Sequence, residues 1–236
     1  MNIYRPDVFV SMSDEIGVNL TAARCRTSAT RSLKWLDEVL ELKLSSTTTY
    51  SPLIFASVEG GGDMESRSIC ATQMAQRDVD GFAIGGVGLD ESRETRQRIL
   101  SEVCSKLPDA KPRLLCGSFG PQQVLDAVEE GMDLFDASYP ISLSKLGYAA
   151  TFSITDNNGP QASKLNLRDR SYARDASPIL EGCECHACRF HTRSYIHHLL
   201  NTRELLADVL LQVYVEAQVF SKHCFPFCVN DFLFSV

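Results

Sequence analysis

The fold of this chain is indicated by residues 52–62, whose sequence is PLIFASVEGGG. The run Pro52–Val58 is mostly apolar and predicts a buried strand, which the glycines after Glu59 bring to an end. Asp63 can cap a helix that the pattern extends to about Gln76, because its carboxylate can accept hydrogen bonds from the first helical N–H groups. A buried strand that is followed directly by a helix is the repeating unit of a parallel sheet.

The same unit recurs on both sides of this stretch. Strands are predicted at residues 7–12, 81–86, 112–117 and 134–137, with helices at about 27–43, 91–107 and 121–131. Five strands that alternate with helices predict a mostly parallel α/β sheet with helical crossovers. Polar and glycine-rich residues follow the carboxyl ends of these strands, where α/β barrels and open sheets place their sites.

Three acids lie at such strand ends, namely Asp14, Glu59 and Asp136. Any one of them alone is explained as a helix cap or as a group that faces solvent. Three acids at equivalent strand ends favour a ligand pocket, so we expect Asp14 and Asp136 to point into one concavity.

A second motif is the stretch Gly182–Cys188, GCECHAC, in which three thiols fall within six residues. The spacing suits a zinc knuckle, in which Cys183, Cys185 and Cys188 supply three thiolates around one ion and a later His or Cys supplies the fourth ligand. The alternatives are unpaired surface thiols and a redox Cys-x-x-Cys pair. A third Cys two residues upstream suits a metal better than an attacking and resolving pair.

The carboxyl-terminal part of the chain is less regular. We expect an incomplete β/α barrel over residues 1–150, an irregular insertion over 151–182, a knuckle and its following helix over 183–215, and an apolar tail over 216–236. The helix is predicted as one long element from about Thr192, with an apolar stripe from Ile196 to Val213. Of the pair His197-His198, one side chain is expected to pack and the other to face water.

Composition limits the function classes. The 236 residues carry a net charge of −7, with 44% hydrophobic and 22% charged residues, as in an ordinary globular protein. No apolar run approaches the roughly 18 residues of a membrane span, and the amino terminus lacks a signal-peptide pattern. We therefore expect a reducing compartment in which the nine cysteines are thiols or metal ligands. Five arginines cluster around the knuckle, and a solvated loop explains them as well as a contact with phosphate does: Arg168, Arg170, Arg174, Arg189 and Arg193.

These residues resemble a known family, the tRNA-guanine/queuine transglycosylases, over about residues 7 to 213. The motifs that carry the resemblance are the knuckle followed by RSYIHHLL at 193–200, together with VEGG at 58–61, GFAIGG at 81–86 and DLFD at 133–136. The resemblance implies a (β/α)8 barrel with a zinc-binding insertion near its carboxyl end. It also implies exchange of guanine for queuine, or a precursor of queuine, at the anticodon wobble position of tRNA.

The site residues of the family match this chain unevenly. Asp136 falls at the nucleophilic aspartate, which attacks the ribose C1′. Asp14 falls at an acid that contacts the purine, Glu59 falls at a base-contacting Gln, and Gly86 falls at a backbone contact to the base. Where the catalytic branch has Thr-Arg, this chain has Ile141-Ser142.

The chain also lacks the earlier Ser-Gly-Gly-Phe segment with the second catalytic acid. It therefore looks more like the family's accessory, non-catalytic branch, which pairs with the catalytic subunit of the queuine enzyme and contacts tRNA through that complex. The five strands would correspond to the later part of the barrel, so we expect an amino-terminally incomplete product. The resemblance implies a cytoplasmic protein, or one attached peripherally to the mitochondrial outer membrane.

Two other functions remain as alternatives. One is an active transglycosylase with Asp136 as nucleophile, and the other is a free zinc-knuckle interaction module. The resemblance also implies a fourth zinc ligand, because the family's His falls at Tyr214 in this chain. A neutral phenol is a poor zinc ligand, so we expect three thiolates, with His223, Cys224 or Cys228 as substitutes for the fourth ligand.

Overall fold

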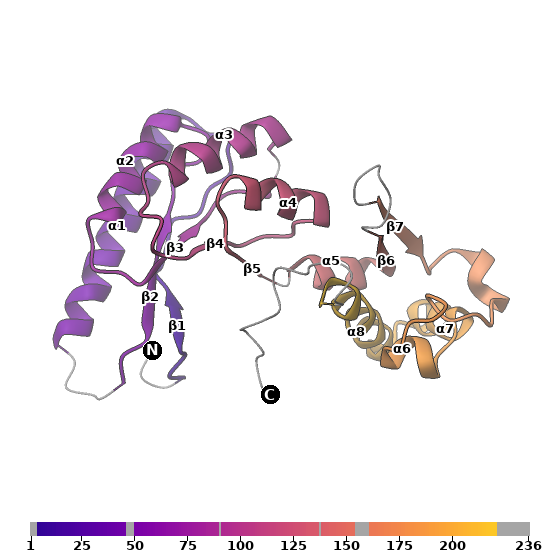
Figure 1. Ribbon diagram of the computed structural model, residues 1–236. Coiled ribbons are helices and arrows are strands. Elements are labelled where there is room, and N and C mark those ends of the chain that lie inside the picture. Colours follow the sequence, from indigo (N-terminus) through magenta and orange to yellow (C-terminus); the bar gives the residue numbers. More distant parts are fainter. Residues whose placement is uncertain (1–3, 46–49, 90, 137, 154–160, 221–236) are drawn as a thin grey trace. The chain divides into compact units, whose positions relative to one another are not determined.

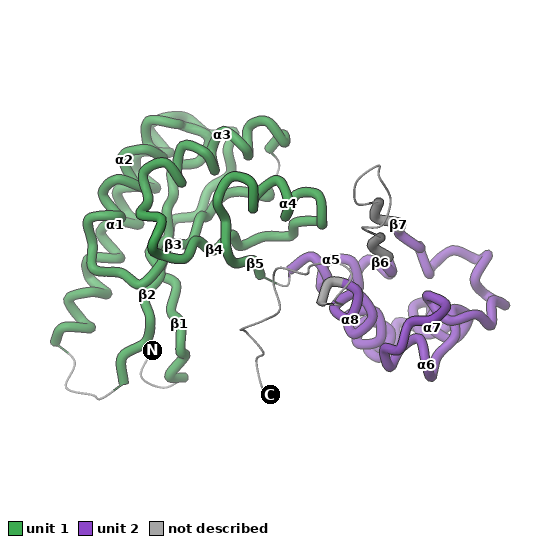
Figure 2. Tube along the Cα trace, in the orientation of Figure 1, with its two compact units in different colours: residues 1–136 green, residues 137–236 purple. Residues whose placement is uncertain are grey.

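The structure is a computed structural model that describes residues 4–45, 50–89, 91–136, 138–153 and 161–220. It divides into two compact units, Met1–Asp136 and Ala137–Val236, which Figure 2 shows in green and purple. Each unit has a hydrophobic core of its own.

The first unit is built on a five-stranded parallel sheet with the strand order β1-β2-β3-β4-β5. The strands are β1 (Val8–Val10), β2 (Leu53–Val58), β3 (Gly81–Ile84), β4 (Arg113–Leu115) and β5 (Leu134–Phe135). Between them run α1 (Ala22–Ser45), α2 (Met64–Ala75), α3 (Arg93–Cys104) and α4 (Pro121–Glu129). Each predicted strand and helix is present, although α1 begins earlier than its apolar period predicts.

One face of this sheet packs against the helices. Phe9 and Ile54 are partners in the register, and Ile54 contributes to the helix-side core together with Phe82, Ile84 and Leu115. Helices α1, α2 and α3 lie side by side along this face (Figure 1). The alternate residues Val8, Val10 and Leu53 are exposed on the other face. A curled parallel sheet with helices on its outer face is the architecture of a partial (β/α)8 barrel, and this fold prediction is confirmed.

Local chemistry explains the start of each helix after a strand end. The Asp63 carboxylate accepts a hydrogen bond from the Ser66 N–H of α2, as predicted, and Ser92 caps α3 through Thr95 in the same way. Pro121 occupies the first turn of α4, where its fixed φ suits the helix and its missing N–H costs no hydrogen bond.

The second unit is helical around a small hairpin. It contains α5 (Ser138–Leu146), β6 (Tyr148–Ser153), β7 (Gln161–Asn166), the 3-10 helix η1 (Arg170–Arg174), α6 (His186–Phe190), α7 (Arg193–Thr202) and α8 (Leu205–Phe220). Strands β6 and β7 pair antiparallel. The irregular insertion predicted over 151–182 therefore includes regular structure, and α5 adds a helix that the sequence pattern does not indicate.

The long helix predicted after the knuckle is divided into α7 and α8. Arg203 adopts a left-handed backbone conformation with φ of 60° and ψ of 39°, and its N–H donates to the Leu199 carbonyl, which also accepts from Glu204 N. Such a cap ends α7 and lets the chain turn before α8 begins. Of the predicted tail over 216–236, α8 includes the residues up to Phe220, and the rest lies outside the described residues. Among the described helices, none is both long enough and apolar enough to cross a membrane.

Candidate functional site

Glu59 is completely buried directly after β2. Its Oε1 accepts a hydrogen bond from Ser57 Oγ at 3.3 Å, and a Cβ at Gly85 would lie only 2.1 Å from the same oxygen. Residue 85 must therefore be glycine for Glu59 to sit where it does. Burial raises the pKa of Glu59, and the charge of Arg67 partly offsets the effect.

Arg67, on α2, ties together the loops at the carboxyl ends of β2 and β3. Its side chain is fully buried, and its Nε donates to Gly61 O at 2.8 Å. Its Nη1 donates to Val58 O at 3.0 Å and to Gly85 O at 2.8 Å. Arg67 is not indicated by the sequence pattern, because an arginine within a predicted helix is normally solvated.

The two acids that follow β1 have different partners. Asp14 is held against α1 by ion pairs with Arg24 at 2.7 Å and Arg31 at 2.8 Å, and the hydrogen bonds from Arg24 are the main cause that lowers its pKa. Glu15 instead accepts a hydrogen bond from Gly86 N at 3.0 Å. Sequence reasoning missed Glu15, although an acid adjacent to Asp14 in the same strand-end loop was a signal for it.

Asp136 is exposed at the end of β5, and its Oδ2 accepts from Gly117 N at 3.2 Å. Burial is the main cause that raises the pKa of nearby Cys116 to about 11, and the negative charges of Asp136 and Glu15 raise it further. The structure thus brings Glu15, Glu59 and Gly86 together beside Arg67. A pocket shared by Asp14 and Asp136 stays a prediction.

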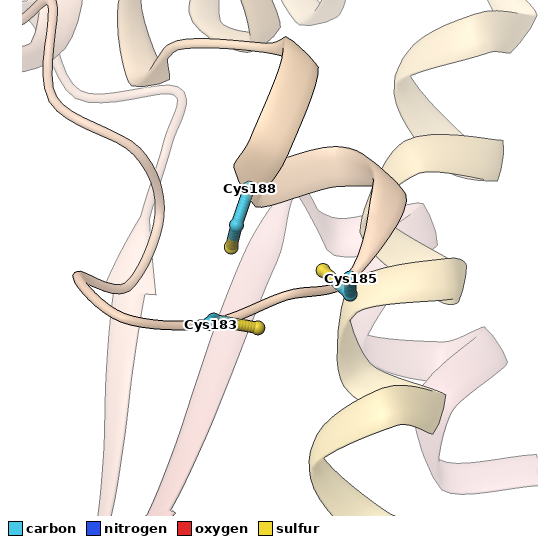
Figure 3. A group of neighbouring side chains, drawn as sticks. All are labelled: Cys183, Cys185 and Cys188. Atoms are coloured by element: carbon cyan, nitrogen blue, oxygen red, sulfur yellow. The ribbon is translucent and has the colours of Figure 1, made fainter.

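The three cysteines of the knuckle converge (Figure 3). The Sγ atoms of Cys183, Cys185 and Cys188 all lie within 4.8 Å of one another. Cys185 precedes the short helix α6, and its carbonyl accepts from Arg189 N, so one tight turn carries both Cys185 and Cys188. Convergence of all three sulfurs favours a metal site over dispersed surface thiols. It also favours a metal site over a redox pair, because a redox pair needs only two of the three sulfurs.

The surroundings of these sulfurs favour thiols over thiolates unless a cation is bound. Burial and the neighbouring thiols raise the pKa values of Cys185 and Cys188, so thiolate forms there need a positive charge close by. A fourth group, Gln218 on α8, places its Nε2 3.4 Å from Cys183 Sγ. The sequence pattern did not indicate Gln218 as a site residue, because it placed residues 216–236 in an apolar tail.

Two further candidate ligands of the second unit, Tyr214 and His197, are buried among other groups. Tyr214, at the family's His position, is fully buried in the second core. His197 is buried, with Nδ1 2.9 Å from Leu167 O and Nε2 2.9 Å from Asn201 Nδ2, whereas His198 is exposed. This confirms that one histidine packs and one faces water. The proposed substitutes, His223, Cys224 and Cys228, lie outside the described residues.

Comparison with known proteins identifies the family. The family model described as "Queuine tRNA-ribosyltransferase" matches residues 1–214. The chain belongs to the queuine tRNA-ribosyltransferase family. Relatives named "Queuine tRNA-ribosyltransferase accessory subunit 2" from Pongo abelii and Homo sapiens are each 36% identical over 89% of this chain, and one from Gallus gallus is 32% identical over 92%.

This member of the queuine tRNA-ribosyltransferase family spans about 59–60% of the length of those curated relatives. The match covers the whole sheet unit, the knuckle and most of the way along α8. Gln218 lies just beyond the matched residues, so the family pattern by itself does not indicate it.

Proposed function

We propose that this chain acts as a non-catalytic accessory subunit of a queuine tRNA-ribosyltransferase, which exchanges guanine for queuine at the wobble position of tRNA. The observation that carries the proposal is that the strand-end groups are already engaged within the chain. Arg24 and Arg31 neutralise Asp14, and Glu15 occupies the Gly86 N–H. A base that bound there would have to displace charge-assisted contacts. The name of the relatives, "Queuine tRNA-ribosyltransferase accessory subunit 2", supports the same role.

The first prediction concerns base exchange by the chain alone. We expect the purified chain to incorporate labelled guanine into tRNA no faster than a protein-free blank, because its pocket groups are paired internally. Addition of the catalytic subunit should start the exchange, and Asp136→Asn in this chain should leave that rate unchanged. Exchange by the chain alone that Asp136→Asn abolishes would instead support the active-transglycosylase alternative.

The proposed docking surface for the catalytic subunit is an exposed apolar stripe on α8. Its members are the half-exposed or exposed side chains Leu205, Leu206, Val209 and Val213. They recur at helical spacing and so lie on one face of the helix. Large apolar side chains gathered on one exposed face typically mark a protein partner. The resemblance to the family implies that this region lies near the subunit interface.

The second prediction tests this surface. Val209→Glu should weaken capture of the chain by the catalytic subunit by at least about tenfold, because an unpaired carboxylate would be buried at the interface. Binding is measured by titration with the purified catalytic subunit. The matched control is Leu44→Glu, an 87% exposed leucine of α1, which should bind like wild type. Equal weakening by both variants would contradict the assignment of the stripe.

We further propose that the ion of the knuckle is zinc. Three convergent thiolates are soft ligands of the kind that structural zinc sites use, and their separations suit one ion. The contact with tRNA is proposed for the exposed arginines around the knuckle, Arg170, Arg174 and Arg189. Arg168 and Arg193 are excluded from that set, since their guanidinium groups bond to carbonyls or to Asp175 within the unit. Localisation in the cytoplasm or on the mitochondrial outer membrane stays a prediction.

A further inference from the structure

Gln218 is a polar side chain of α8 that contacts a sulfur of the knuckle. The residue is only 7% exposed, and its Nε2 lies 3.4 Å from Cys183 Sγ. Buried amides need polar partners, because a carboxamide that loses its water without replacement destabilises the fold. The contact with Cys183 Sγ is one such polar interaction, and it places the amide of Gln218 beside the cysteine site.

The distance itself suits a ligand. In a tetrahedral zinc site with Zn–S near 2.3 Å and Zn–O near 2.1 Å, a sulfur and an oxygen ligand stand about 3.6 Å apart. The terminal amide atom of Gln218 stands 3.4 Å from Cys183 Sγ, which is close to that separation. A half-turn about the last side-chain bond exchanges the amide nitrogen and oxygen, so the oxygen can take the same position.

We propose that Gln218 supplies the fourth ligand of the knuckle through its amide oxygen. This inference rests on the proposed zinc site and adds a residue to it. Tyr214, one helical turn earlier, lies in the apolar core, and a phenol is a weak zinc ligand. Gln218 thereby joins α8, the helix that carries the docking stripe, directly to the knuckle.

The test compares zinc affinity in the whole chain, measured by competition with a chromophoric chelator. Gln218→Leu keeps the size of the side chain but offers no oxygen, and we expect it to weaken zinc binding by about tenfold to a hundredfold. Gln218→Glu keeps an oxygen ligand and should bind zinc at least as tightly as wild type. The matched control, Gln212→Leu, removes an α8 amide that contacts Glu216 instead, and it should bind like wild type.

A spectroscopic readout separates a ligand from a neighbour. Cobalt(II) absorption bands report the donor atoms of a tetrahedral site, so Gln218→His should shift the bands as nitrogen replaces oxygen. Zinc binding that Gln218→Leu leaves intact would overturn the inference and leave the zinc site standing. Weakening by Gln218→Glu equal to that by Gln218→Leu would also overturn it, since that result assigns Gln218 as an N–H donor to the Cys183 thiolate. Wild-type chain without stoichiometric zinc would overturn both proposals.

Discussion

Replacing Cys188 by serine is expected to release the proposed zinc ion and to unfold the helices around the knuckle. Cys188 is the most buried of the three ligands, and it packs in the second core with Ile196 and Leu199. The apparent binding free energy of structural zinc is about 10–16 kcal/mol in zinc-finger peptides, which is as large as the whole net stability of a typical domain, about 5–15 kcal/mol. Loss of one thiolate removes much of that stabilisation.

Hydrogen exchange measured by mass spectrometry can locate this effect. Amides of α7 and α8 should lose protection in Cys188→Ser, and treatment of wild type with a chelator should reproduce the pattern. Amides of α1 and β2 should remain protected, because they belong to the separate core of the first unit. Cys116→Ser, which changes a thiol of the first unit, should retain zinc and protection. Full protection of α7 in metal-free protein would contradict a structural role for the ion.

The sheet unit was predictable because its signals are local. Each strand is a short apolar run, and a glycine or an acid at its end marks where the chain leaves the sheet. Around β2, the glycines that follow Glu59 permit backbone that a side chain would block: Gly60 and Gly61 have φ of 144° and 55°. The capping carboxylate of Asp63 then starts α2. The apolar composition of the strand and the turn residues that follow it predict the same structure along this stretch. Such agreement between local signals makes a fold predictable from sequence.

The second unit was harder to predict because tertiary contacts decide its elements. The break between α7 and α8 falls at Arg203, an arginine with a left-handed backbone, where glycine would be the usual signal. Arg168 donates to the carbonyl of Leu200 near that break, so a residue distant in sequence satisfies the helix end. The hairpin of β6 and β7 likewise depends on pairing between segments whose apolar alternation is weak.

The same distinction applies to the candidate sites. Cys183, Cys185 and Cys188 fall within one short motif, so their convergence follows from spacing alone. Glu15 and Gln218 could not be predicted from a local motif, because their roles depend on which elements the fold brings beside Gly86 and Cys183. Arg67 belongs to the same class, since its three carbonyl partners come from two different strand ends.

Arg67→Met is expected to destabilise the first unit by about 3 kcal/mol or more, because it removes three buried hydrogen bonds from a charged donor, and the loss of such a donor costs about 1–3 kcal/mol for each group left unsatisfied. The change leaves the carbonyl of Gly61 without its guanidinium donor, and it removes the cation that offsets the charge of Glu59. Urea denaturation measures the cost. Arg77→Met is the matched control, because Arg77 pairs with the half-exposed Asp37, and such pairs contribute at most about 1 kcal/mol. Equal costs for the two variants would contradict the role of Arg67.

The pH dependence of this cost identifies Glu59 as the reason for it. Burial raises the pKa of Glu59 above its ordinary value of 4.5, so its contribution to stability is full below that value and declines as the pH rises through the folded-state pKa. Without Arg67 the pKa rises further, and Arg67→Met should therefore cost more near pH 7.5 than near pH 5. When Arg67→Met is made in the Glu59→Gln background, the side chain at 59 is neutral at both pH values. The cost of Arg67→Met relative to Glu59→Gln should therefore be the same at pH 5 and pH 7.5. A difference that persists in the double variant would show that a group other than Glu59 titrates.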